Sequence, residues 1–274
     1  MPKNKTPIQR FPKTAERRYT QYLLRYVRRI SKAIIEKSNQ YLPTVVEEAK
    51  RNLINDDFTD TISNLVSSIN IELSGLAVIN SLDQGILETA EAINTQNRKE
   101  MTKIITQILG ISLSDYEPAV GEQMKAFQKE NIALIKSLTT QQVERVEPMI
   151  YRGVRQGLSY SQIMKDIRAD QAISRNRARL IARDQTNKFN GQLSQIRQKS
   201  VGVTEYRWRN ANDSRVRGNP SGLYPKAKYS HWNREGKKFK WNEPPPDGHP
   251  GEPIQCRCWA EPVIEELENP DDVV

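Results

Sequence analysis

The sequence predicts a protein that is mainly α-helical in its N-terminal and central regions and ends in a small α+β C-terminal module. Two observations support this fold class. From Tyr19 to Ile196, apolar side chains recur at steps of three and four residues, which is the period of an amphipathic helix. After Gly202 the pattern changes, and Val203–Arg209 alternates and is rich in residues that favour strands.

Shifts in composition and periodicity divide the chain into five regions. We expect a disordered basic arm over residues 1–13, because this stretch is polar and contains three prolines. An elongated helical region follows over 14–110, and a second helical region over 111–200. Residues 201–262 form a small β-rich module that holds every cysteine and histidine, and 263–274 form an acidic tail.

Several local signals predict where the helices begin and end. We expect Pro43 to interrupt the first helix, since proline is not tolerated in a helix interior. We expect a turn near 80–83 and a break over 110–118. Thr139–Gln142 and Ser159–Gln162 fit the capping box that starts a helix, which predicts short helices over 140–153 and 160–169 and a third from about 174.

Two further strands are expected after the first one in the C-terminal module. Lys237–Trp241 is a candidate, and Ile254–Ala260 is another, separated from it by a stretch rich in proline and glycine. Residues 218–230 contain Pro220, Gly222 and Pro225 and are typical of a surface loop.

The chain is basic, with a formal net charge of +9 over 274 residues. This charge favours an acidic or polyanionic partner and does not by itself say which. Eleven basic and only two acidic residues lie in 1–37, and many of the basic ones fall on the polar faces of the first helix. Two interpretations stay open: a surface that docks on DNA or on an acidic protein, and an ordinary solvated helix face. The candidate contact residues are Arg17, Arg18, Arg25, Arg28, Arg29 and Lys32.

Two cysteines one residue apart cannot build a disulfide framework, and so nothing indicates secretion. Residues 1–13 lack the apolar core and cleavage site of a signal peptide. No apolar run approaches the roughly 20 residues that span a bilayer. We therefore expect a soluble protein without a membrane anchor, made in a reducing cytoplasm.

The chain's two cysteines and two histidines all lie within its last 44 residues, which makes them candidate metal ligands. If Ile254–Ala260 is a strand, Cys256 and Cys258 present their sulfurs on the same face. With His231 and His249 they match the ligand types of a tetrahedral zinc site, and zinc is the cofactor we consider. The alternative is two buried thiols beside histidines that bond to the backbone.

Charged residues nearby suggest a structural network, which we assign to Arg183, Asp184, Asp213, Arg215 and Arg217. Asp213 could orient His231, as carboxylates orient histidines in metal sites. A surface that contacts a partner is a second interpretation. A third is a metal-dependent nuclease or DNA-binding or DNA-processing protein that uses His231, His249 and Asp213.

Several motifs together give the chain a family resemblance over about residues 130–262. They are Asn131–Lys136, Arg179–Gln185, Gly202–Val203 leading to Trp208, Asp213–Arg217, His231 with Gly236–Phe239, and Pro250–Gly251 leading to Cys256–Cys258. In this order they resemble the phage head-morphogenesis family of Mu F-like and SPP1-type minor head proteins. The chain departs from the family pattern at residues 218–230, which intervene between the Asp-x-Arg motif and the histidine.

The resemblance implies a structural role and no catalytic residues. Minor head proteins of this kind are virion components, present in few copies at the portal vertex and needed for functional, DNA-filled heads. The expected partners are the portal protein, the major capsid or scaffolding protein and double-stranded DNA. The expected locations are the virion and, during assembly, the host cytoplasm, with roles in DNA packaging or ejection as a late protein.

Overall fold

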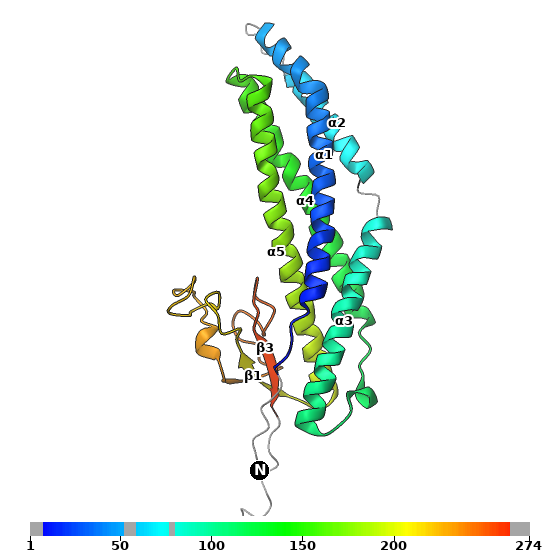
Figure 1. The fold of residues 1–274 in the computed structure, drawn as a ribbon, viewed down its shortest axis with the longest axis vertical. Helices are drawn as coiled ribbons and strands as arrows, with labels where there is room; N and C mark the ends of the chain where they lie inside the picture. Colours follow the sequence, from blue (N-terminus) through cyan, green and yellow to red (C-terminus); the bar gives the residue numbers. More distant parts are fainter. Residues whose placement is uncertain (1–7, 52–58, 77–79, 264–274) are drawn as a thin grey trace, which may run out of the picture. The chain divides into compact units, whose positions relative to one another are not determined.

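A computed structural model describes residues 8–51, 59–76 and 80–263 of the chain. Within these residues it contains five α-helices followed by a small sheet, which confirms the predicted fold class (Figure 1). The helices are α1 (Lys13–Arg51), α2 (Thr59–Leu76), α3 (Asn80–Leu109), α4 (Gly121–Arg155) and α5 (Tyr160–Ser200). The strands are β1 (Glu205–Arg209), β2 (Lys238–Lys240) and β3 (Trp259–Val263). None of the helices in the described ranges is long and apolar enough to cross a membrane.

The chain divides into two compact units, each assembled from separate stretches of sequence. Unit 1 comprises Met1–Glu16, Thr89–Phe127 and Arg183–Val274, and unit 2 comprises Arg17–Glu88 and Gln128–Ala182. Four of the helices therefore contribute residues to both units. The division of the chain into five regions stays a prediction, although α3 and α5 end next to two of the predicted boundaries, at Leu109 and Ser200.

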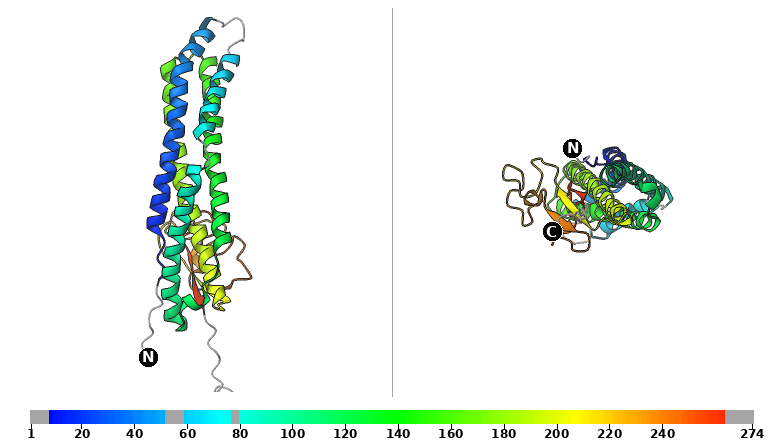
Figure 2. Two further views of the ribbon diagram at one scale, coloured as in Figure 1. Left: turned by 90° about the vertical axis from the view of Figure 1, so that its right-hand side faces the viewer. Right: turned by 90° about the horizontal axis from the view of Figure 1, so that it is seen from below.

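Unit 2 is a bundle of long helices packed through apolar stripes (Figure 2). The predicted stripe of α1 is buried, and the buried residues of α4 and α5 repeat at the same helical spacing. Polar contacts fix the register between helices. The Tyr19 hydroxyl donates to Asn131 Oδ1 at 2.5 Å, and Arg145 donates two hydrogen bonds to the fully buried Asp170 carboxylate, at 2.7 and 3.1 Å.

Several predicted helix boundaries are wrong, because the helices run through them. Pro43 lies inside α1, where its exposed side faces solvent and water can take the carbonyl that loses its partner. The turn expected at 80–83 is instead the first turn of α3. The capping motif at Thr139 lies within α4, and the helix expected to begin near Ser174 is the middle of α5.

The second capping motif is confirmed at the start of α5. The Ser159 N–H donates to Gln162 Oε1 at 2.8 Å, and the Gln162 N–H donates back to Ser159 Oγ at 3.4 Å. The predicted break between α3 and α4 is also confirmed, with a single 3₁₀ turn at Leu113–Tyr116.

In unit 1 a three-stranded antiparallel sheet, ordered β2-β1-β3, follows α5. Tyr206 pairs with Phe239 on one side and Pro262 on the other, and Trp208 pairs with Ala260. Tyr206 and Trp208 point to the buried face of the sheet, where they form a small core with four other residues: Trp241, Cys256, Cys258 and Ala260. The two cysteines are thus part of the core of the C-terminal module.

The sheet is tied to the last turns of α5. Gln198 donates from Nε2 to the Ala260 carbonyl at 2.8 Å and accepts from the Trp241 indole N–H at 3.2 Å. Residues 8–12 of the predicted disordered arm also pack in this unit, since Gln9 is buried and donates to Ser194 Oγ at 2.8 Å. The expectation of disorder is therefore wrong for this part of the arm. Residues 1–7, and 264–274 of the predicted acidic tail, lie outside the described residues.

Candidate functional site

Cys256 and Cys258 lie in a tight loop that precedes β3. The strand predicted over Ile254–Ala260 is wrong in its first half, because β3 begins only at Trp259. Gln255 has a φ of +56°, which no strand residue adopts, and the Cys256 N–H donates to the Pro253 carbonyl at 2.8 Å to close a turn. The Gln255 N–H donates to Asp184 Oδ1 of α5 at 2.8 Å, which fixes the loop to the helix.

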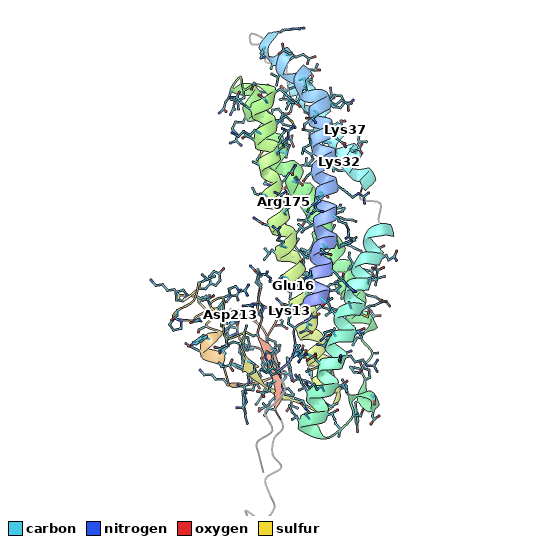
Figure 3. The ribbon with its side chains drawn as sticks, in the orientation of Figure 1. Lys13, Glu16, Lys32, Lys37, Arg175 and Asp213 are labelled. Carbon is cyan, nitrogen blue, oxygen red and sulfur yellow. The ribbon has the colours of Figure 1, made fainter. Side chains whose placement is uncertain are left out.

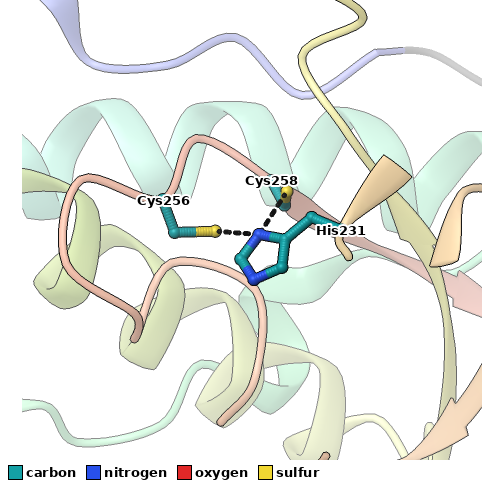
Figure 4. A group of neighbouring side chains, drawn as sticks. All are labelled: His231, Cys256 and Cys258. Carbon is teal, nitrogen blue, oxygen red and sulfur yellow. Dashed lines mark hydrogen bonds between the residues drawn. The ribbon is translucent and has the colours of Figure 1, made fainter. Parts of the chain in front are cut away.

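The loop brings both sulfurs to one side chain from a distant part of the chain (Figure 4). His231 Nδ1 lies 3.5 Å from Cys256 Sγ and 3.5 Å from Cys258 Sγ. Each residue offers a ligand atom, and the three atoms lie within 4.8 Å of one another. All three residues are buried. We call this group the Cys–Cys–His cluster.

The other side of the histidine ring faces a carboxylate. His231 Nε2 is 2.9 Å from Asp247 Oδ2, and Arg234 reaches Asp247 Oδ1 at 2.6 Å. The Trp208 ring packs edge-on against His231, with centroids 5.0 Å apart. These contacts fix the orientation of the ring so that Nδ1 points at the two sulfurs.

Sequence reasoning assigned the orienting role to Asp213, and the structure assigns it to Asp247. Asp213 instead forms an ion pair with Arg257 and accepts from the Arg215 N–H at 2.9 Å. Asp247 follows three consecutive prolines and has no distinguishing motif of its own. Asp247 can be identified only from its position in the folded chain, where its segment returns toward His231.

His249 does not join the cluster. Its Nδ1 is 2.9 Å from the Tyr206 hydroxyl, and its ring packs against Trp241 at a centroid distance of 5.0 Å. The predicted four-ligand set is therefore wrong in this member. Within the described residues, the Cys–Cys–His cluster is the only group of at least three cysteine, histidine or carboxylate side chains positioned to hold a metal.

The electrostatics of the cluster separate the two thiols. Burial raises the pKa of both, but at Cys256 hydrogen bonds with Cys258 and His231 outweigh burial, so that its pKa falls well below the usual value. Burial and the neighbouring Cys256 raise the pKa of Cys258 well above the usual value. Burial also acts on Asp247, yet its hydrogen bonds with His231 and Arg234 lower its pKa overall. Of the two thiols, Cys256 is therefore the one whose deprotonation the surroundings favour.

The residues of the predicted structural network are placed around the cluster but form separate contacts. Arg183 pairs with Glu16 at 3.3 Å, and Asp184 holds the cysteine loop as described above. Arg217 donates to the Ile254 carbonyl at 2.7 Å and lies 3.9 Å from Asp247. Asp184 and Arg217 thus attach the cysteine loop to α5 and to the segment that follows β1.

A cavity of about 580 Å³ opens beside the cluster, and all three cluster residues line it. The rest of its lining includes five basic side chains and no carboxylate: Arg183, Arg215, Arg217, Lys226 and Arg257. The predicted nuclease centre is not assembled here, because His249 and Asp213 make the other contacts described above and stay outside the cluster.

The six basic residues proposed for partner contacts all lie on the exposed side of α1 within unit 2. One of them, Lys32, forms a loose ion pair with Glu36 at 3.6 Å. Arg28 and Lys32 also border a hollow of about 350 Å³, together with Arg175 of α5. Figure 3 labels Lys32 on α1 and Arg175 on α5. The structure thus places these cations on one accessible face, and their binding role stays a prediction.

Comparison with known proteins gives one family and one relative. Residues 144–261 match the family model described as phage Mu protein F like protein. An uncharacterized protein of Haemophilus influenzae is 32% identical over 179 residues, which is 64% of this chain. The chain spans 38% of the length of that relative. No solved structure matches the chain. The matched range contains α5, β1, β2, the first three residues of β3 and the Cys–Cys–His cluster, and it confirms over residues 144–261 the resemblance to a phage head-morphogenesis family, that of the phage Mu protein F like proteins.

Proposed function

We propose that this chain is a minor capsid protein of a tailed phage, associated with the portal vertex and needed for the assembly of DNA-filled heads. The family match over residues 144–261 carries the proposal, because it covers the whole cluster-bearing module and the helix that supports it. This family supports a role in head assembly. That this chain associates with the portal, and with capsid or scaffolding proteins, is part of what we propose.

The proposal gives separate binding roles to two surfaces, one on the C-terminal module and one on α1. The C-terminal module acts as a rigid docking element, because its cysteine loop donates to Asp184 and its strand β3 accepts a buried hydrogen bond from Gln198. The basic face of α1 contacts an acidic surface, either on an assembling head or on packaged DNA. Exposed basic side chains increase the rate of association with an acidic surface more than they increase the affinity for it.

Co-expression with the portal protein of the same phage, followed by affinity purification, tests the proposal. We expect the two proteins to purify together, and the protein to be present in assembled heads. A preparation that never associates with portal or heads under these conditions would refute the proposal.

A matched pair of variants tests the basic face. Changing Arg25, Arg28 and Arg29 to Gln should weaken incorporation into heads, while the control triple Arg152→Gln, Arg155→Gln, Lys165→Gln should not, although its residues are also exposed in unit 2. Equal incorporation of both variants would remove the basic face from the proposal. Binding of duplex DNA with a steep salt dependence, lost only in the α1 variant, would identify DNA as the acidic partner.

A further inference from the structure

The Cys–Cys–His cluster has the dimensions of a metal site. In tetrahedral zinc sites, Zn–S bonds of about 2.3 Å and Zn–N bonds of about 2.0 Å place the sulfur and nitrogen ligand atoms about 3.5 Å apart. Both cysteine sulfurs lie 3.5 Å from His231 Nδ1. The two sulfur–nitrogen distances are therefore those expected when the three ligand atoms occupy corners of a tetrahedron with zinc at its centre.

The surroundings of His231 match those of a metal-bound histidine. Ligating histidines almost always donate their second ring N–H to a carboxylate or carbonyl, which fixes the tautomer and leaves the other nitrogen free to bind. His231 Nε2 faces Asp247 at 2.9 Å, so that Nδ1 is the nitrogen left facing the sulfurs. Arg234 and Arg217 hold the carboxylate in place.

We propose that Cys256, Cys258 and His231 hold a Zn²⁺ ion through three protein ligands, with the fourth coordination position open to the basic cavity. Two thiolates and one imidazole select zinc among the common divalent ions, since magnesium and calcium prefer oxygen ligands. The site is independent of the portal proposal, because it rests on the geometry of the module alone.

The cavity indicates what completes the coordination sphere. All three cluster residues line it, and its other charged lining residues are five cations. A water molecule or an anionic oxygen can donate a lone pair to the metal, and the neighbouring cations favour the anionic oxygen. We assign the fourth position to a water molecule that a small anion can replace.

Metal binding to the cluster would also stabilise the module. The core of the module is small, with six buried residues, and a bound ion would join the segment that carries His231 to the loop that carries Cys256 and Cys258. Both cysteines must be deprotonated to bind the ion, so binding is expected to weaken as the pH falls.

The first test is the metal content of the full chain, purified under reducing conditions without chelator. We expect close to one zinc ion per chain. Cys256→Ser, Cys258→Ser and His231→Gln should each lose it. His249→Gln is the matched control, because this second histidine of the module is buried but lies outside the cluster, and it should keep its zinc. Wild-type protein that contains no zinc, and binds none when zinc is added, overturns the proposal.

Cobalt substitution tests the geometry without relying on variants that may unfold. Wild-type protein loaded with Co²⁺ should show the visible bands of tetrahedral cobalt and thiolate-to-cobalt charge transfer. Azide, a small anion, should shift these bands if the fourth position is open, and unchanged bands would overturn that part of the proposal. Asp247→Asn should keep the same bands but weaken metal binding by about 10- to 100-fold. Loss of zinc in His249→Gln with a folded module would instead show a four-ligand site.

Discussion

Arg197 is the most buried cation in the described part of unit 1, and its removal makes a quantitative prediction. Its side chain is fully buried and donates to Glu117 Oε1 at 2.8 and 3.2 Å. It also donates to Asn97 Oδ1 at 2.7 Å and to Asn94 Oδ1 at 2.6 Å. One guanidinium therefore satisfies three acceptors on α3 and on the segment that follows it.

Arg197→Met keeps the length of the side chain and removes every one of these donors. Breaking a buried ion pair by deleting one partner costs about 3–5 kcal/mol, and because Glu117 is partly exposed we expect the lower end, about 3 kcal/mol. That corresponds to a decrease of roughly a hundredfold in the ratio of folded to unfolded protein. Arg98→Met is the matched control, because Arg98 pairs with the same carboxylate at 3.3 Å while 57% exposed. The control should cost less than about 1 kcal/mol.

Urea unfolding followed by tryptophan fluorescence measures both variants. All four tryptophans of the chain, at positions 208, 232, 241 and 259, belong to unit 1, so that the signal reports the unit that contains Arg197. We expect a clear decrease in the unfolding midpoint for Arg197→Met alone. If the two variants shift the midpoint equally, burial of the arginine does not determine its contribution and the reasoning is wrong.

Three further predictions concern other elements. Burial lowers the pKa of His249 below its ordinary value of 6.5, so below about pH 6.5 the unfolded chain binds a proton more readily than the folded one, and the free energy of unfolding decreases as the pH falls. In His249→Gln the free energy of unfolding, measured at a series of pH values, should depend less on pH. Ser159→Ala should lower stability by about 1 kcal/mol in thermal unfolding followed by circular dichroism, because it removes half of the confirmed capping box; an unchanged melting temperature would contradict this. Gly191→Ala should destabilise unit 1 in the fluorescence assay although alanine favours helices, since its Cβ would lie 2.7 Å from the Pro250 carbonyl oxygen; Gly121→Ala, in the same unit and with open space around it, should be harmless.

The helices and strands could be predicted because each carries its period in its own sequence. The buried stripe of α1 and the alternation of Tyr206 and Trp208 are local patterns, and the structure follows both. The capping box at Ser159 could be found for the same reason. It is confirmed because the preceding Gly157, with a φ of +67°, ends the previous helix and leaves Ser159 free to start a new one.

The errors in helix boundaries have a tertiary cause. The motif at Thr139 has the same residue types as the one at Ser159, but no glycine interrupts the chain before it. There the Thr139 hydroxyl is hydrogen-bonded to the Tyr26 hydroxyl of α1 at 3.0 Å, and Gln142 donates to Ser31 Oγ of the same helix at 3.1 Å, so these side chains are engaged in packing and α4 continues. Pro43 is tolerated because Leu42 and Val45 on either side of it are buried, and that packing outweighs one lost backbone hydrogen bond. Propensity at one residue cannot reveal such packing.

The cluster shows why spacing alone was a poor guide to the candidate site. A single residue between two cysteines predicts a strand in which both sulfurs face the same side. In the structure both sulfurs also face one side, but they do so from a loop in which Gln255 has a positive φ. That conformation is held from outside the loop, since Asp184 accepts the Gln255 N–H and Gln198 donates to the Ala260 carbonyl. Asp184 and Gln198 both belong to α5, and they bind the chain just before and just after the two cysteines. These two polar residues of α5 therefore help to set the positions of the sulfurs.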